Sequence, residues 1–101
     1  MTMKVQRSSG NVFRDLGFSP KEAESLRLRA ELMVELGRLI KERKLTQSAA
    51  AKLFGVTQPR VSDLMRGKID LFSIDTLVSM LARAGMRVEI RLARAGRAQA
   101  A

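Results

Sequence analysis

Residues 57–68 carry side chains that can hydrogen-bond to flat polar groups and to phosphates. The amide of Gln58 can bind an adenine edge in two places, and the guanidinium of Arg60 can do the same to guanine or hold a phosphate. Arg66 and Lys68, at the far end of the stretch, are suited to phosphate contacts. The full set of candidate DNA-binding residues is Gln47, Thr57, Gln58, Pro59, Arg60, Ser62, Asp63, Arg66 and Lys68. These residue types favour recognition of nucleic acid.

Asp63 is the exception in this set, because phosphates repel a carboxylate unless it accepts a hydrogen bond from a cytosine amino group. It lies three residues from both Arg60 and Arg66, which also permits an ion pair within one helix. We favour the ion pair, in which Asp63 holds arginine side chains in place instead of reading a base.

The segment 46–67 predicts two short helices joined by a tight turn. Thr46 and Thr57 are suited to cap the two helices, and Gly55 permits the left-handed backbone of a sharp turn. Val61 and Leu64, three residues apart, would attach the second helix to a core, and its remaining positions then face outward. This is the layout of a helix-turn-helix, which places its second helix in the major groove of DNA.

The flanking segments predict further helices. Ser19 with Glu22 forms a capping-box pattern and predicts a long helix to about Arg43, while Ser73 caps a helix ending near Ala84. We expect residues 1–10 to be a disordered basic arm and residues 93–101 a disordered tail.

An apolar segment precedes the long helix and predicts one helical turn ended by Gly17. It packs either on its own domain, which we favour, or on a partner protein. Its apolar residues are Val12, Phe13, Leu16 and Phe18.

Residues 86–92 alternate apolar and charged side chains and predict a β-strand. A single strand cannot satisfy its own backbone groups, so the same strand of a second copy is the simplest partner. Antiparallel pairing centred on Ile90 would place Glu89 opposite Arg91 and Val88 opposite Leu92, which suits both faces. The alternative is irregular coil packed on the core.

The pattern Leu45-Thr46-Gln47, Ala51, Leu53, Gly55-Val56, Thr57-Gln58, Val61-Ser62, Leu64 and Gly67 resembles the lambda-repressor-like (Xre/Cro type) helix-turn-helix family. The resemblance implies an all-α fold of four to five helices, which the C-terminal strand would extend. Domain organisation then follows as one domain over residues 11–92.

The wider order of segments over residues 11–92 is similar to small HigA-like antitoxins and regulators. The resemblance implies a homodimeric repressor bound to a palindromic operator in double-stranded DNA. It also implies a RelE/HigB-like toxin partner, for which the apolar segment before the long helix is the candidate contact. Two alternatives stay open: a stand-alone regulator, and a protein-interaction module that neutralises a toxin without specific DNA binding.

The composition predicts a basic domain that binds a polyanionic partner. The chain has 101 residues, a net charge of +9 and neither Cys nor His, which disfavours structural zinc, disulfides and His-based catalysis. We expect no enzyme activity, no metal and no cofactor, and a cytoplasmic protein that associates with the nucleoid when bound to DNA and does not contact membranes. With only four Phe and no Trp or Tyr, the chain lacks the stacking platform typical of RNA-binding proteins.

Overall fold

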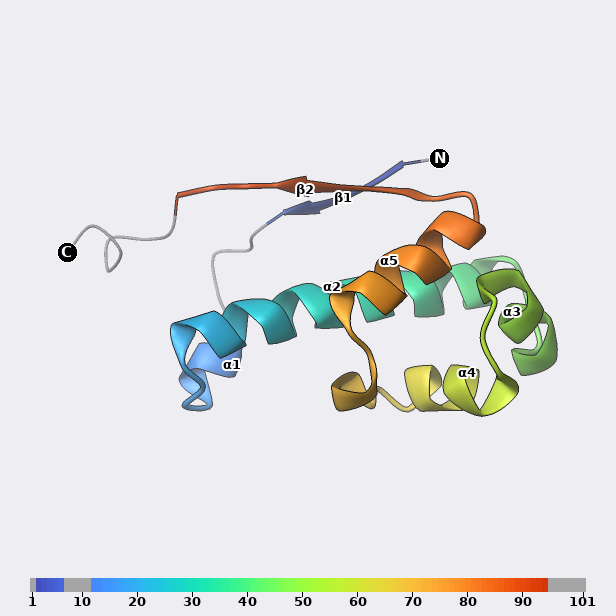
Figure 1. The fold of residues 1–101 in the computed structure, drawn as a ribbon, viewed down its shortest axis with the longest axis horizontal. Helices are drawn as coiled ribbons and strands as arrows, with labels where there is room; N and C mark the ends of the chain where they lie inside the picture. The colour runs from blue at the N-terminus through green and yellow to red at the C-terminus, as the bar shows by residue number, and fades with distance from the viewer. Residues whose placement is uncertain (1, 7–11, 95–101) are drawn as a thin grey trace.

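A computed structural model describes residues 2–6 and 12–94 of the chain. Five α-helices, one 3₁₀-helix and two strands follow one another in this part (Figure 1). Their bounds are β1 Thr2–Gln6, α1 Val12–Asp15, α2 Pro20–Glu42, α3 Gln47–Phe54, α4 Gln58–Met65, η1 Ile69–Leu71, α5 Ile74–Arg83 and β2 Arg87–Arg91. The predicted helical fold with a C-terminal strand is confirmed.

Helix α2 is the long central element of the fold and begins and ends as predicted. The Ser19 hydroxyl accepts a hydrogen bond from the Glu22 amide at 3.2 Å, and the Glu22 carboxylate accepts from the Ser19 amide at 3.4 Å. This capping box satisfies amide groups that have no partner within the helix. The first half of α2 extends beyond the main core, and α1 and β1 also contact this helix.

The core lies where α2 packs against α3, α4 and α5 (Figure 1). Its side chains are aliphatic apart from two phenylalanines, and they come from positions spaced three or four residues apart on each helix. The buried members of the cluster are Leu32, Met33, Leu36, Leu39, Ile40, Ala50, Ala51, Phe54, Val61, Leu64, Phe72, Leu77, Met80, Leu81 and Ala84.

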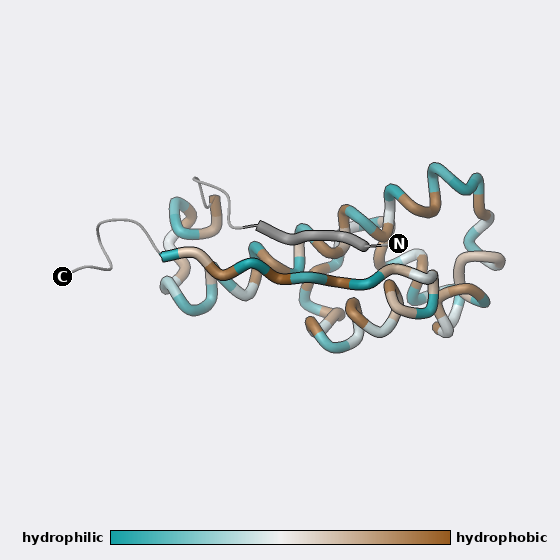
Figure 2. Tube along the Cα trace, turned by 90° about the horizontal axis from the view of Figure 1, so that it is seen from above, coloured by the Kyte–Doolittle hydropathy of each residue, from teal (hydrophilic) through white to brown (hydrophobic). Residues whose placement is uncertain are grey.

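The N-terminal segment corrects one prediction. Residues 2–6, expected to belong to a disordered arm, form β1, which pairs in parallel with β2 from Thr2 opposite Arg87 to Gln6 opposite Arg91. The two strands lie next to each other on one side of the helices (Figure 1). Figure 2, seen from above, shows β2 running across the helices. The predicted strand at residues 86–92 is therefore present but not alone, because β1 supplies backbone hydrogen-bond partners along one edge of it. The rest of the predicted arm, residues 7–10, lies outside the described part of the chain.

Only the first two residues of the predicted C-terminal tail, 93–101, are described by the structure. Residues 93 and 94 follow β2 without regular secondary structure, and the remainder of the predicted tail, 95–101, lies outside the described residues. Among residues 2–6 and 12–94, no helix is both long enough and apolar enough to cross a membrane.

The apolar segment before α2 folds back onto its own chain without becoming buried. Helix α1 contacts α2, and the rings of Phe13 and Phe18 meet edge to face with their centroids 6.3 Å apart. Val12 and Leu16 nevertheless stay 59% and 68% exposed. The segment therefore contacts its own domain, as we favoured, and leaves apolar side chains exposed, while its packing on a partner protein stays a prediction.

Candidate nucleic-acid interface

Local capping interactions shape the α3–turn–α4 unit as the sequence predicts. The Thr46 hydroxyl accepts from the Ala49 amide at 3.0 Å, and the Thr57 hydroxyl accepts from the Arg60 amide at 3.3 Å. Gly55 lies between the two helices with φ of +73°, a conformation that residues with a Cβ rarely adopt. These residues place the start of α4 directly after the turn.

The buried residues of α4 decide which of its side chains can reach a ligand. Val61 and Leu64 are 0% and 4% exposed and attach one face of the helix to the core. Because α-helical positions rotate by about 100° per residue, Pro59, Ser62 and Arg66 fall on the opposite face. Of these, Pro59 and Arg66 are exposed, and Ser62 is half-buried.

The remaining predicted contacts surround this face. Gln58 is exposed at the first position of α4, next to the cap Thr57. Gln47 is exposed at the first position of α3, where unpaired amide groups and the helix dipole favour an anion. Lys68 follows the end of α4, with its side chain 48% exposed. Helices α3 and α4 contact each other, so the exposed start of α3 belongs to the same unit as the outer face of α4.

Asp63 takes part in ion pairs, as expected. One carboxylate oxygen lies 4.0 Å from a guanidinium nitrogen of Arg60, and the other lies 3.9 Å from the Lys68 amine. The second cation is therefore Lys68, and Arg66 is not part of an ion pair recorded among the described residues. Both separations are at the long end for an ion pair, so the contribution to stability is small.

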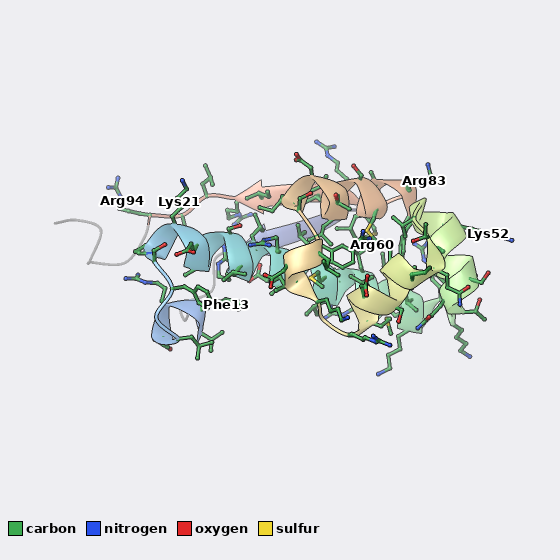
Figure 3. The ribbon with its side chains drawn as sticks, turned by 60° about the horizontal axis from the view of Figure 1, so that its bottom comes forward. Phe13, Lys21, Lys52, Arg60, Arg83 and Arg94 are labelled. Carbon is green, nitrogen blue, oxygen red and sulfur yellow. The ribbon has the colours of Figure 1, made fainter. Side chains whose placement is uncertain are left out.

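Arg60 lies on the flank of α4, away from the outer face. Its guanidinium donates a hydrogen bond to the Leu71 carbonyl at 3.3 Å and lies 5.6 Å from the centre of the Phe72 ring. In Figure 3 the side chain lies between α4 and the segment that leads to α5. In this arrangement Arg60 contacts its own chain, because the segment after α4 folds back beside it, and its side chain stays 41% exposed. Its contact with a base or a phosphate stays a prediction.

Other basic residues near this unit were missed by the sequence reasoning. Lys52 is exposed on α3, and Arg83 at the end of α5 approaches Gly55 (Figure 3). Arg29, on α2, donates to the backbone of the segment after α4. The sequence could have pointed to Arg29, because it is a basic residue among the apolar positions of α2. No sequence feature predicts that Arg83 approaches Gly55. Within the described ranges, no group of three or more acidic, His or Cys side chains is placed to hold a metal ion.

Comparison with known proteins shows which family the chain resembles. A family model described as a helix-turn-helix domain matches residues 12–93, which run from α1 to just beyond β2. A solved structure described as a candidate XRE family transcriptional regulator has 34% sequence identity and a TM-score of 0.69, with 79% of this chain and 90% of that chain covered. The chain is a helix-turn-helix protein of the XRE family. No curated protein matches the chain.

The match to the helix-turn-helix family model extends over the short helix α1 and over β2 as well as the α3–turn–α4 unit. The strand β1 lies outside the residues that the family model matches. The pairing of β1 with β2 is therefore a feature of this chain that the family model does not itself describe.

Proposed function

We propose that this XRE-family protein is a sequence-specific DNA-binding transcriptional regulator that acts as a repressor. The observation that carries the proposal is the outer face of α4, which is polar and bears Arg66 while Val61 and Leu64 anchor the opposite face. A net charge of +9 favours a polyanionic partner. The relative described as a candidate transcriptional regulator adds support, since 90% of that chain is covered.

The roles of individual residues follow from their positions. Gln58, at the exposed start of α4, reads a base edge, and Thr57, Pro59 and Ser62 pack beside it in the groove. Gln47, Arg66 and Lys68 contact phosphates and fix the orientation of the domain on the duplex. Asp63 stays outside base recognition because its carboxylate faces two cations of its own chain.

Binding to the region upstream of its own gene is the first test. We expect a specific complex in a mobility-shift or anisotropy titration, with affinity that falls steeply as salt increases. A random duplex of equal length is the control, and equal affinity for both would overturn the proposal of sequence-specific binding.

Two variants separate base contacts from phosphate contacts. Gln58→Ala should lose preference at one base pair, a change of about 1–3 kcal/mol. Lys68→Ala should weaken binding to all sequences and lower the slope of log affinity against log salt by about 0.9. Lys21→Ala removes the same charge at the start of α2, far from α4 (Figure 3), and should leave that slope unchanged.

We also propose that the protein acts as a homodimer through β2. Within the described sheet one edge of β2 pairs with β1, and its other edge has no strand beside it. Ile90 and Leu92 are 49% and 90% exposed, which is unusual for large apolar side chains and would be relieved in a dimer. Antiparallel pairing centred on Ile90 joins residues 88–92 of the two copies and would present two α4 helices to a palindrome with half-sites about 34 Å apart.

Sedimentation tests this assembly. Ile90→Asp should shift the protein from dimer to monomer, because the substitution places two carboxylates at the two-fold axis. Val34→Asp introduces the same charge at another exposed apolar position, 59% exposed on α2, and should leave the dimer intact. A dimer that persists in Ile90→Asp would exclude this register.

An antitoxin role is the second candidate, and the exposed apolar residues in and just after α1 favour it. Val12, Leu16 and Phe18 are 59%, 68% and 43% exposed, and Phe13 lines an apolar groove of about 470 Å³ with Val34 and other residues of α2 and α4. A RelE/HigB-like toxin bound here would cover side chains that otherwise face water.

Co-purification with the product of an adjacent small gene tests the antitoxin role. Leu16→Asp should abolish that complex and leave DNA binding unchanged, whereas Ile90→Asp should leave toxin binding unchanged. Failure to co-purify would leave the chain a stand-alone regulator.

A further inference from the structure

The segment between α4 and α5 contains η1 and lies directly after the proposed DNA-binding helix. Within the segment itself, few hydrogen bonds hold η1 in place. Gly67 leaves α4 with φ of +71°, and η1 then forms a single 3₁₀ turn without a side-chain cap. Its internal backbone bonds run from the Leu71 amide to the Lys68 carbonyl at 3.1 Å and from the Phe72 amide to the Ile69 carbonyl at 3.2 Å. So short a turn depends on contacts with neighbouring elements to hold one conformation.

Arg29 holds this segment from the side of α2. One of its guanidinium nitrogens donates to the Ile69 carbonyl at 3.3 Å and to the Phe72 carbonyl at 3.5 Å. Its Nε lies 3.4 Å from the Ser25 carbonyl, one turn earlier in α2. Through this one nitrogen Arg29 joins the start and the end of η1 to the central helix, while its Nε stays on the Ser25 carbonyl. A single amine cannot make both sets of contacts at once.

Arg60 holds the same segment from the side of α4. It donates to the Leu71 carbonyl, the one between those that Arg29 contacts, and its guanidinium lies over the ring of Phe72. Phe72 is 1% exposed and belongs to the core, so the arginine is attached to a fixed point. Three carbonyl oxygens of one short segment therefore receive hydrogen bonds from two arginines on different helices.

Asp63 connects Arg60 to Lys68 at the protein surface. This carboxylate lies between Arg60 and Lys68, at 4.0 Å and 3.9 Å, so the cation at the end of α4 is linked to the residue that holds η1. Lys68 is also the residue immediately before η1. Any movement of η1 would therefore displace Lys68 relative to the outer face of α4.

We propose that Arg29 and Arg60 are positioning residues that fix residues 68–72 against α4 and so place Lys68 for a DNA phosphate. Arg60 then contributes to affinity without reading a base. This inference rests on the proposed DNA-binding function for its effect on affinity. The positioning of η1 itself is a property of the free protein and is measured separately.

Amide hydrogen exchange in the free protein tests the positioning. Arg29→Gln and Arg60→Gln should each accelerate exchange at Leu71 and Phe72, the two amides bonded within η1, while core amides of α5 keep their rates. Lys68→Ala, which leaves both arginines in place, is the matched control and should not change exchange at η1. Unchanged exchange in both arginine variants would overturn the inference, whether or not the protein binds DNA.

Binding to a panel of operators, each with one base pair replaced, tests the role in recognition. Both arginine variants should lose affinity by a similar factor for every operator, roughly three- to thirtyfold, as expected for residues that act through a neighbouring contact. The salt slope should fall as it does in Lys68→Ala, and adding Lys68→Ala to either variant should cost little more.

The conservative variants complete the test. Arg60→Lys keeps a donor for the Leu71 carbonyl and should recover part of the affinity. Arg29→Lys should recover less, because one amine cannot contact η1 and the Ser25 carbonyl at the same time. If Arg60→Gln instead changed the preference at a single base pair while Arg29→Gln had no effect, Arg60 would be a base reader and the inference would be wrong. A wild-type protein without any DNA affinity would refute the proposed function, and the exchange experiment would still decide the positioning.

Discussion

Replacing Gly55 by alanine tests the turn on which the orientation of α4 depends. Gly55 has φ of +73°, and such left-handed backbone costs a residue with a Cβ about 1–2 kcal/mol. Alanine also makes the unfolded chain less flexible, which returns about 0.4–1 kcal/mol. We therefore expect Gly55→Ala to lower the free energy of unfolding by about 1 kcal/mol.

The surroundings of Gly55 add a smaller term. A Cβ at this position would meet the guanidinium end of Arg83, which is exposed and can move aside. The double variant Gly55→Ala with Arg83→Ala should then match Gly55→Ala to within about 0.5 kcal/mol. A full recovery of stability in the double variant would mean that the clash, and not the backbone, causes the loss.

Two other glycines provide matched controls. Gly67 has φ of +71° and open space around the position of a Cβ, so Gly67→Ala should cost about as much as Gly55→Ala. Gly37 lies within α2, also with open space and without a positive φ. Since alanine is favoured over glycine in a helix by about 0.8–1 kcal/mol, Gly37→Ala should stabilise the protein.

Urea denaturation followed by circular dichroism measures all these variants. With a slope of about 1 kcal/mol per molar urea for a small domain, the midpoint should fall by about 1 M for Gly55→Ala and Gly67→Ala and rise by about 1 M for Gly37→Ala. A rise in the midpoint for Gly55→Ala would refute the assignment of the turn as left-handed.

Two further predictions concern helix caps and the core. Thr57→Ala and Ser73→Ala each remove a hydroxyl that accepts from a first-turn amide, at 3.3 Å and 3.1 Å, and each should cost about 1 kcal/mol in urea denaturation. Under folding conditions only Thr57→Ala, at the start of α4, should also weaken DNA binding, and an equal loss in both variants would argue against contact by this helix end. Leu77→Ala empties a site that is 0% exposed and should cost about 2–5 kcal/mol by the same assay, whereas a loss below about 1 kcal/mol would contradict the packing of α5.

Local sequence signals predicted the helices well because helix ends are decided by residues a few positions apart. Thr46, Thr57 and Ser73 cap α3, α4 and α5, and Gly55 turns the chain as expected. The buried pair Val61 and Leu64 follows from helical spacing alone. Each of these features depends on neighbours in the chain, which the sequence displays directly.

The strand β1 could not be predicted in the same way. Residues 2–6 alternate polar and apolar side chains, but only Met3 and Val5 are apolar, so the pattern by itself indicates a strand only weakly. Their strand conformation depends on β2, more than eighty positions later, which offers an edge for pairing. Pairing between segments so far apart is decided by how the helices between them fold.

By itself, the sequence determined the helix-turn-helix, its caps, its buried face and the basic, polar character of its outer surface. The tertiary structure alone decided which of those polar side chains remain available. Arg60 looks like a base reader in the sequence, yet it is drawn to Leu71 and Phe72 because η1 folds back beside α4. Arg29 contacts the same segment across 40 residues of chain at its Ile69 carbonyl. A side chain's type fixes the bonds it can make, but only the packed fold determines which partners lie within reach.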